Sequence, residues 1–348
     1  MTKRYSENAS HKSFKETRRR PLSLETERLV KTEPLIAGHD LPLLVQPAIR
    51  DLKLPVWAAN NRDFIQRALL KHGGLLLRHF KLKLAAEFEQ FIAAIAGPLL
   101  RYDYRSTPRS QVEGRIYTST EYPADQTIPL HNEMSYARMW PMKIGFFCVR
   151  AAAHGGETPL ADSRQVTRRI SPQVTERFMR KQVMYVRNYG EEIDLPWRDV
   201  FQTNDTTAVE SYCQGEGIEI EWGSDGRLRT RQICPAVAEH PRTGERLWFN
   251  QAHLFHVSSL APKVQETLLS LCPDSLPRNA YYGDGSPIEE SVLGEIREAY
   301  RRETVTFPWL DGDILLLDNM LTAHGRLPFA GLRQVLVGMA EAHSVKRR

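Results

Sequence analysis

Hydrophobic and polar positions divide the chain into an aperiodic arm and a long folded body. Residues 1 to about 40 are polar and show no periodicity, so we expect a basic, flexible arm with little structure of its own. From Asn61, apolar residues recur at helical spacing until Gly73–Gly74. A buried strand is predicted at 75–80, followed by a second amphipathic helix over about 84–96.

The remainder alternates between apolar runs typical of strands and helical patterns. Strands are predicted at 115–122, 143–150, 183–189, 247–251, 313–318 and 333–341, and helices after Ser171–Pro172, around 206–214, at 262–271 and at about 287–302. Strands that flank long helical insertions favour a mainly β fold with α insertions. We therefore predict that residues 41–348 form one domain, a distorted double-stranded β-helix (a cupin-like jelly roll) flanked by helices.

Composition and charge exclude several classes of protein. The contents of 41% hydrophobic and 26% charged residues are ordinary for a globular protein. Much of the net charge of +5 belongs to residues 1–20, which are either a solvated tail or a docking segment for an acidic partner. No basic motif with interleaved aromatics suggests nucleic-acid binding, and no apolar run is long enough to span a membrane.

The four cysteines, Cys148, Cys213, Cys234 and Cys272, are widely scattered. No pair has the C-x-x-C spacing of a redox or zinc motif, which favours free thiols in a reducing compartment. We therefore expect a cytoplasmic protein. Glycine-rich phosphate loops of the Walker or Rossmann type are also missing, which argues against the usual nucleotide-binding folds.

The segment with the strongest chemical signal is His131–Asn132–Glu133. On an extended segment, positions i and i+2 project from the same face, so an imidazole and a carboxylate would be directed at one point. These two groups make up two-thirds of the facial triad of non-haem iron(II) oxygenases. The best candidate for the missing imidazole is His324, which follows the apolar run at 314–317.

A bare H-x-E pair is weak evidence, because such pairs occur often by chance, and His324 alone could be a polar residue in a turn. The residues around His324 strengthen the prediction of a metal site. Polar groups are unusually dense over residues 318–326, directly after a strand that needs none of them.

Several longer motifs resemble the taurine dioxygenase/clavaminate synthase-like superfamily of iron(II)- and 2-oxoglutarate-dependent oxygenases (the TauD/TfdA family), and most closely its SyrP-like branch. The matching stretches are 117–123, 131–136, 155–159, 161–164, 248–251, 279–285, 318–320 and 324–326. They extend over most of the folded chain and leave out the N-terminal arm.

The resemblance implies a set of site residues. It assigns the Fe(II) ligands to His131, Glu133 and His324, and the binding of the cosubstrate 2-oxoglutarate to Thr158 and Arg333. A guanidinium suits the distal carboxylate of 2-oxoglutarate, because it offers a planar pair of donors. Halogenating members of the family lack the carboxylate ligand, so Glu133 favours hydroxylation, with 2-oxoglutarate and O2 converted to succinate and CO2.

Substrate recognition is predicted less directly. Arg105 and Arg109 are candidates for binding a carboxylate-bearing substrate, the alternative being surface ion pairs, and Asn250 either contacts substrate or fixes the site. The SyrP-like resemblance implies an amino acid, or an aminoacyl group on an acidic peptidyl carrier protein, hydroxylated at the β-carbon in antibiotic or other secondary metabolism. A hydroxylase or desaturase of free amino acids or small peptides is the alternative within this class. A non-catalytic metal-binding jelly roll and a zinc hydrolase are the alternatives outside it.

Overall fold

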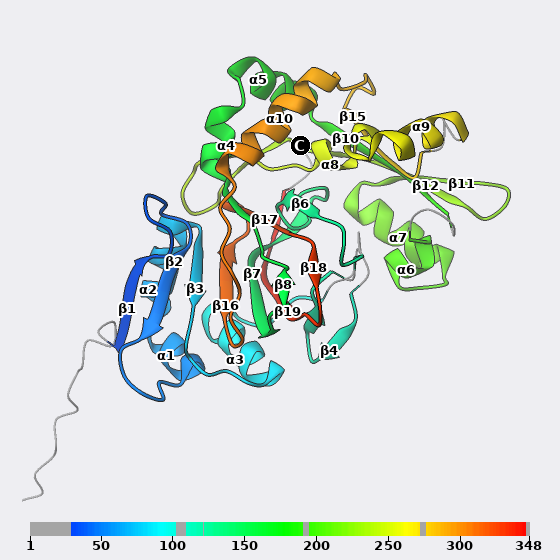
Figure 1. Ribbon diagram of the computed structural model, residues 1–348. Coiled ribbons are helices and arrows are strands. Elements are labelled where there is room, and N and C mark those ends of the chain that lie inside the picture. Colours follow the sequence, from blue (N-terminus) through cyan, green and yellow to red (C-terminus); the bar gives the residue numbers. More distant parts are fainter. Residues whose placement is uncertain (1–28, 102–108, 121, 191–194, 272–275, 346–348) are drawn as a thin grey trace, which may run out of the picture.

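An eight-stranded sheet forms the centre of the structure, a computed structural model in which residues 29–101, 109–120, 122–190, 195–271 and 276–345 are described (Figure 1). Its strand order is β1 (Val30–Pro34), β2 (Leu43–Pro47), β3 (Gly74–Leu77), β16 (Ile314–Asp318), β7 (Met139–Arg150), β19 (Gln334–Ser344), β5 (Ile116–Thr118) and β4 (Gln111–Glu113). Neighbouring strands run antiparallel except β2 and β3, which are parallel.

Two small sheets carry the motifs singled out in the sequence. The first has the order β6 (Ile128–His131), β17 (Thr322–Arg326) and β9 (Leu160–Asp162), and the second pairs β8 (His154–Gly155) with β18 (Phe329–Ala330). Segments from the middle of the chain thus meet the C-terminal part in antiparallel pairs.

A further β region is inserted between β9 and β16. It consists of a four-stranded sheet with the order β11 (Glu219–Trp222), β12 (Leu228–Cys234), β10 (Val183–Tyr189) and β15 (Arg278–Tyr282), and of the pair β13 (Val237–Glu239) and β14 (Arg246–Trp248).

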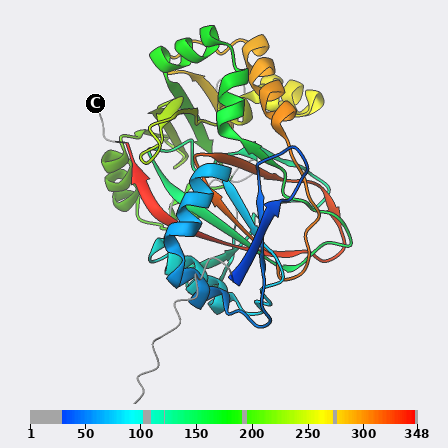
Figure 2. The same cartoon turned by 90° about the vertical axis from the view of Figure 1, so that its left-hand side faces the viewer.

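Helices flank both β regions. Those before the large sheet's central strands are α1 (Leu54–Asn60), α2 (Arg62–His72) and α3 (Ala85–Ala96). Those of the insertion are α4 (Ser163–Arg169), α5 (Pro172–Lys181), α6 (Trp197–Phe201), α7 (Thr206–Glu216), α8 (Ala252–Phe255), the 3-10 turn η2 (Val257–Ser259), α9 (Pro262–Leu271) and α10 (Glu290–Glu303). Figure 2 shows α1–α3 lying against one face of the large sheet.

The apolar run of β16 is buried on both faces of the large sheet. Ile314 and Leu316 pack into the cluster formed with α1–α3, whereas Leu315 and Leu317 face the opposite cluster, which includes Phe146. The sequence of a strand that is buried on both faces is a continuous hydrophobic run, without the alternation of a strand that has one exposed face. This second face of the sheet is the one that meets the small sheet β6-β17-β9, because the Phe146 ring lies against His324, with centroids 5.0 Å apart.

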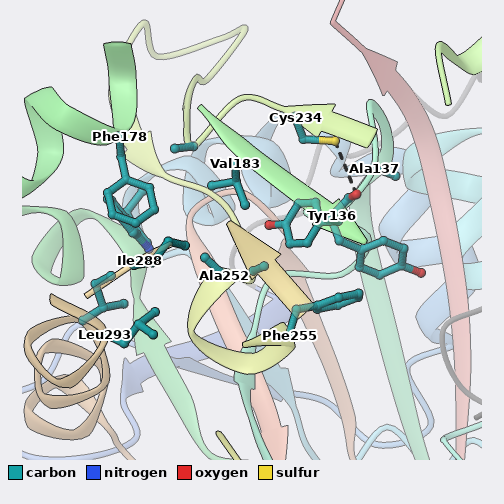
Figure 3. Close-up of a cluster of buried hydrophobic side chains, with 14 of the residues drawn as sticks. Tyr136, Ala137, Phe178, Val183, Cys234, Ala252, Phe255, Ile288 and Leu293 are labelled. Carbon is teal, nitrogen blue, oxygen red and sulfur yellow. Dashed lines mark hydrogen bonds between the residues drawn. The ribbon is translucent and has the colours of Figure 1, made fainter. Parts of the chain in front are cut away.

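A third apolar cluster joins the insertion to the segment that follows β6. Figure 3 shows Phe178, Val183, Ile288 and Leu293 at one side of this cluster and Tyr136 with Phe255 at the other. The Tyr136 and Phe255 rings are 5.4 Å apart, and the Cys234 thiol donates to the carbonyl of Tyr136 at 3.4 Å. The chain just after Glu133 is therefore anchored in a packed core.

The mainly β architecture with helical insertions agrees with the prediction. The predicted arm, however, is too long, because Val30–Pro34 forms β1 and pairs with β2; residues 1–28 lie outside the described residues. Cys148, Cys213 and Cys234 are free and buried, as expected, whereas Cys272 lies outside the described residues. No helix in the described part of the chain is long and apolar enough to span a membrane.

Candidate metal centre

Three predicted ligands meet at one point, where Glu133 and His324 are buried and His131 is partly buried. His131 ends β6, His324 lies in β17 directly opposite to it in the antiparallel register, and Glu133 lies in the turn that follows β6. One potential ligand atom from each residue lies within 4.8 Å of the others. Nε2 of His324 is 3.8 Å from Oε2 of Glu133, and the two imidazole centroids are 4.6 Å apart.

The backbone around Glu133 differs from the extended conformation predicted for it. β6 ends at His131, Glu133 belongs to a turn, and Met134 has a positive φ of 56°. The carboxylate reaches the imidazoles from a turn whose backbone is hydrogen-bonded to Asn319, and not because positions 131 and 133 alternate along one strand.

Gly325 permits the close approach of β6 and β17. A Cβ atom at this position would lie 2.5 Å from the carbonyl oxygen of Ile128 on β6. The register also shifts between His324 and Arg326. The two histidine-bearing strands therefore meet at a place where only a residue without a side chain fits.

The state of the two imidazoles fits metal binding. Burial lowers the pKa of His131 and, more strongly, that of His324; the neighbouring His131 and Arg109 add to the second effect. Both rings are thus neutral at neutral pH, which is the form that binds a metal. His131 directs Nδ1 toward the carbonyl of Pro129 at 2.8 Å, which leaves Nε2 as its ligand atom. Two neutral imidazoles and one carboxylate are the donor set of a non-haem iron(II) site.

A buried network of amide groups holds the ligand turn in place. The Asn319 side chain accepts from the Glu133 N–H at 2.7 Å and donates to the carbonyls of Glu133 and Pro141 at 2.9 and 2.8 Å. The Asn132 amide donates to the carbonyl of Asn319 at 2.6 Å, and Gln251 donates to the carbonyl of Asn132 at 2.8 Å. Both asparagines are fully buried, so these hydrogen bonds fix the position of Glu133 relative to β17.

Sequence analysis did not single out Asn132, Asn319 and Gln251, although all three belong to the motifs that it quoted. Their partners lie on distant parts of the chain, and no local pattern reports such contacts. Asp318 is not one of the three candidate metal ligands. Its carboxylate accepts from the N–H groups of Met320 and Leu321, both at 3.1 Å, and lies 3.2 Å from Nε2 of His240.

The two predicted cosubstrate residues lie near the double glycine of β8. Thr158 is buried, and its hydroxyl accepts from the indole N–H of Trp309 at 3.1 Å, a partner that the sequence did not indicate. Arg333 donates from Nε to the carbonyl of Gly156 at 3.0 Å, and its Nη1 lies 3.4 Å from the Ser119 hydroxyl. Burial lowers the pKa of Arg333 to about 10, so it still carries its charge at neutral pH.

The geometry of Gly155 and Gly156 explains why this motif has two glycines. Both have positive φ, 69° and 76°. A Cβ on Gly155 would lie 2.2 Å from the Pro328 carbonyl oxygen, and one on Gly156 would lie 3.0 Å from the Arg333 side chain. The glycines thus let β8 pack directly against the segment that carries the predicted anchor.

Arg326, two residues after His324, binds backbone carbonyl groups instead. It donates to the carbonyls of Tyr122, Pro123 and Gln126 at 2.6 to 2.9 Å and so holds the approach to β6 in place. This engagement leaves Arg333 as the better match for a carboxylate anchor.

The three predicted substrate residues differ in their positions and contacts. Arg105 lies outside the described residues. Arg109 is buried and donates from Nη2 to Oε2 of Glu133 at 2.8 Å. Asn250 is fully buried; its amide donates to the carbonyl of Ala236 at 2.9 Å and accepts from the Ala252 N–H at 3.0 Å, which fixes the turn before α8. A direct contact of these residues with substrate stays a prediction.

Two histidines on paired strands and one carboxylate in the adjoining turn form the donor set of a class of proteins, the mononuclear non-haem iron oxygenases. Residues 38–340 match the sequence model of the taurine catabolism dioxygenase TauD/TfdA family. The chain belongs to this family and is an Fe(II)- and 2-oxoglutarate-dependent dioxygenase.

Two curated relatives cover most of the chain. The dapdiamide synthesis protein DdaC of Enterobacter agglomerans is 39% identical over 309 residues, which are 88% of this chain and 93% of that protein. A clavaminate synthase-like protein of Arabidopsis thaliana is 30% identical over 304 residues, which are 83% of this chain and 89% of that protein.

Solved structures support the fold at lower identity. PvcB of Pseudomonas aeruginosa has a TM-score of 0.52 and 16% identity, and the match covers 89% of this chain and 90% of that one. AAD-2, solved with Mn(II) and N-oxalylglycine, has a TM-score of 0.52 and 13% identity over 89% of this chain and 96% of that one. These structures share the fold of this chain.

Proposed function

We propose that the protein hydroxylates an unactivated C–H bond, at the β-carbon, of an amino acid or of an aminoacyl group carried by a peptidyl carrier protein. The reaction would belong to the assembly of a secondary metabolite or non-ribosomal peptide. The observation that carries this proposal is the complete triad with its carboxylate, Glu133, within reach of His324. The similarity to a dapdiamide synthesis protein supports a biosynthetic role.

The proposed division of labour follows from the chemistry of each group. When bound, Fe(II) and 2-oxoglutarate would activate O2, which is the oxidant of the reaction. His131, Glu133 and His324 would hold the metal. Arg333 would pair with the distal carboxylate of 2-oxoglutarate through its planar donors, and Thr158 would add a hydroxyl donor.

Apolar packing is suited to keeping water from this chemistry. Phe146 lies against the His324 ring, and Trp309 is buried beside Thr158. Charge-assisted contacts between Arg333 and a carboxylate would be strong in such surroundings, because few water molecules compete for the same donors.

We infer that the fold is a distorted double-stranded β-helix within one domain, which includes β1 and therefore begins before the predicted boundary at residue 41. The large sheet around β16, β7 and β19 would form one layer, and the small sheet β6-β17-β9 the other. Contact between Phe146 of β7 and His324 of β17 supports this pairing of layers. A cytoplasmic location stays a prediction, and the three free, buried cysteines are consistent with it.

The test is a screen of free and carrier-bound amino acids for substrate-coupled release of succinate. Under the proposal, an aminoacyl group on its carrier gives succinate and a product that is heavier by one oxygen atom. A product that is lighter by two hydrogens would instead indicate desaturation. Turnover of a free amino acid or small peptide alone would favour the alternative within the class. Absence of any iron-dependent succinate formation would contradict an oxygenase.

A further inference from the structure

Arg109 contacts the metal-binding carboxylate on the side that faces the second histidine. Nη2 of Arg109 lies 2.8 Å from Oε2 of Glu133, and Nε2 of His324 lies 3.8 Å from the same oxygen. The two side chains of this ion pair are only 4% and 3% exposed. The guanidinium therefore lies against the carboxylate that would bind a metal, in a site with little solvent.

The signs of the charges determine what this contact does. The triad supplies one negative charge, from Glu133, because the histidines bind a metal as neutral rings. A dication at Glu133 would therefore be repelled by Arg109 a few ångströms away, and burial leaves this repulsion poorly screened. An anion that joins the metal would be attracted by the same guanidinium.

We propose that Arg109 weakens the binding of the bare metal ion and strengthens the binding of an anionic ligand to the metal-loaded site. This inference rests on the proposed iron and 2-oxoglutarate site. Arg109 acts here through Glu133 and through its charge, so that the protein favours the metal together with its carboxylate cosubstrate over the metal alone.

Two other roles for Arg109 predict different changes in the affinities for the metal and for 2-oxoglutarate. If its hydrogen bond mainly positions Glu133 for ligation, loss of the side chain should weaken metal binding, as is common for residues behind metal ligands. If Arg109 only binds substrate, neither the metal nor 2-oxoglutarate should respond to its loss. The proposal alone requires opposite changes in the two affinities.

The experiment uses anaerobic titration of the full-length protein with Co(II), followed through the visible absorption of the bound ion, and then titration of the Co(II)-loaded protein with 2-oxoglutarate. Neither step requires turnover. For Arg109→Gln we expect the Kd of Co(II) to fall at least about tenfold and the Kd of 2-oxoglutarate to rise at least about tenfold. Arg109→Lys retains a cationic group, and Arg109 donates to Glu133 through the single atom Nη2, so at a pH where the ammonium is charged both constants should stay within about threefold of wild type.

Arg78→Gln is the matched control. Arg78 also forms an ion pair, with the buried Asp313 at 2.6 Å, but this carboxylate is not one of the three candidate metal ligands. Its removal should leave both affinities unchanged. Arg109→Met provides a second neutral variant if Arg109→Gln does not fold.

Weaker or unchanged Co(II) binding in the neutral variants would overturn the inference. So would loss of the wild-type affinities in Arg109→Lys, because the effect would then depend on shape rather than charge. If wild type and the Arg78 variant fail to bind 2-oxoglutarate when loaded with Co(II), the proposed cosubstrate site itself is wrong. Failure of the Arg109 inference and failure of the proposed cosubstrate site therefore give different results.

Discussion

His131 and His324 lie directly opposite each other in the antiparallel pair β6–β17, with their ring centroids 4.6 Å apart. The pairing of two strands thus sets the distance between the two nitrogen ligands. A shift of this register, or a wider separation of the strands, would move one imidazole away from the other while leaving both side chains intact.

Replacement of Gly325 by alanine tests this dependence. The added Cβ would meet the Ile128 carbonyl at 2.5 Å, so β17 must move away from β6. We expect a loss of about 1–3 kcal/mol in the free energy of unfolding and clearly weaker metal binding. Denaturant titration and Co(II) titration measure the two effects. Gly294→Ala in α10 is the control: a Cβ there meets no other atom, so neither stability nor metal affinity should fall. If Gly325→Ala bound the metal as tightly as wild type, the spacing of the two strands would not determine metal affinity.

Asn319→Ala should weaken the site without removing a ligand. The change deletes three hydrogen bonds to the backbone of Glu133 and Pro141 and leaves buried polar groups without partners. We expect a loss of about 2–4 kcal/mol in the free energy of unfolding, together with reduced metal affinity. Asn60→Ala, which removes an exposed side-chain hydrogen bond to Val56, is the control. Unaltered metal affinity in a folded Asn319 variant would show that the network is dispensable.

Arg333→Gln tests the proposed anchor. Loss of a charge-assisted pair with a buried carboxylate should cost about 2–5 kcal/mol of cosubstrate binding, and so raise the apparent KM for 2-oxoglutarate far more than that for substrate. Initial rates at varied concentrations of each compound separate the two effects. A change confined to the substrate KM would move Arg333 into the substrate pocket.

His253 should make the folded state sensitive to acid. Burial lowers its pKa to about 3, against an ordinary value near 6.5 in the unfolded chain. As the pH falls from 6.5 toward 3, the unfolded state takes up a proton that the folded state excludes. Stability therefore falls with decreasing pH, by about 1.4 kcal/mol per pH unit from this group.

His253→Gln is the comparison for this acid sensitivity. Glutamine can still donate to the Leu130 carbonyl, which His253 contacts at 3.3 Å, but it does not titrate. Denaturant unfolding at a series of pH values should give a shallower loss of stability below pH 6.5 in the variant. Parallel curves for the two proteins would show that His253 is not responsible.

Delivery by a carrier should appear as salt-sensitive kinetics. Carrier proteins are generally acidic, and residues 1–20 of this chain are strongly basic. We expect a carrier-bound aminoacyl group to react much faster than the free amino acid, with a rate that falls as ionic strength rises. Deletion of residues 1–20 measures the contribution of the arm alone. Equal turnover of the free amino acid, indifferent to salt, would contradict carrier delivery.

Local pattern was sufficient to predict the elements with strong apolar signals. The run at 314–317 is β16, residues 262–271 form α9, and the double glycine after α2 marks the start of β3. β1 was missed because four of its five residues are exposed, so its sequence VKTEP carries no hydrophobic pattern. It forms because an edge position next to β2 satisfies its backbone.

The candidate site was predictable where a motif reports chemistry and unpredictable where contacts join distant segments. His131, Glu133 and His324 were chosen for their residue types, and they lie together. Trp309 and Thr158, which are joined by a hydrogen bond, lie 151 positions apart in the sequence. Asn319 and Glu133, which are also hydrogen-bonded, lie 186 positions apart. Contacts of this kind leave no trace in spacing or periodicity, and only the tertiary structure reveals them.

The pairing of β6 with β17 also has a consequence for how the protein is made. Roughly 190 residues separate the two histidines, and at about 5–20 residues per second a ribosome would release the second one about 10–40 s after the first. During this interval the nascent chain holds His131 and Glu133 without their partner strand. The nascent chain should therefore complete its iron site only after β17 has been synthesised, which pulse-labelled translation in the presence of radioactive iron could follow.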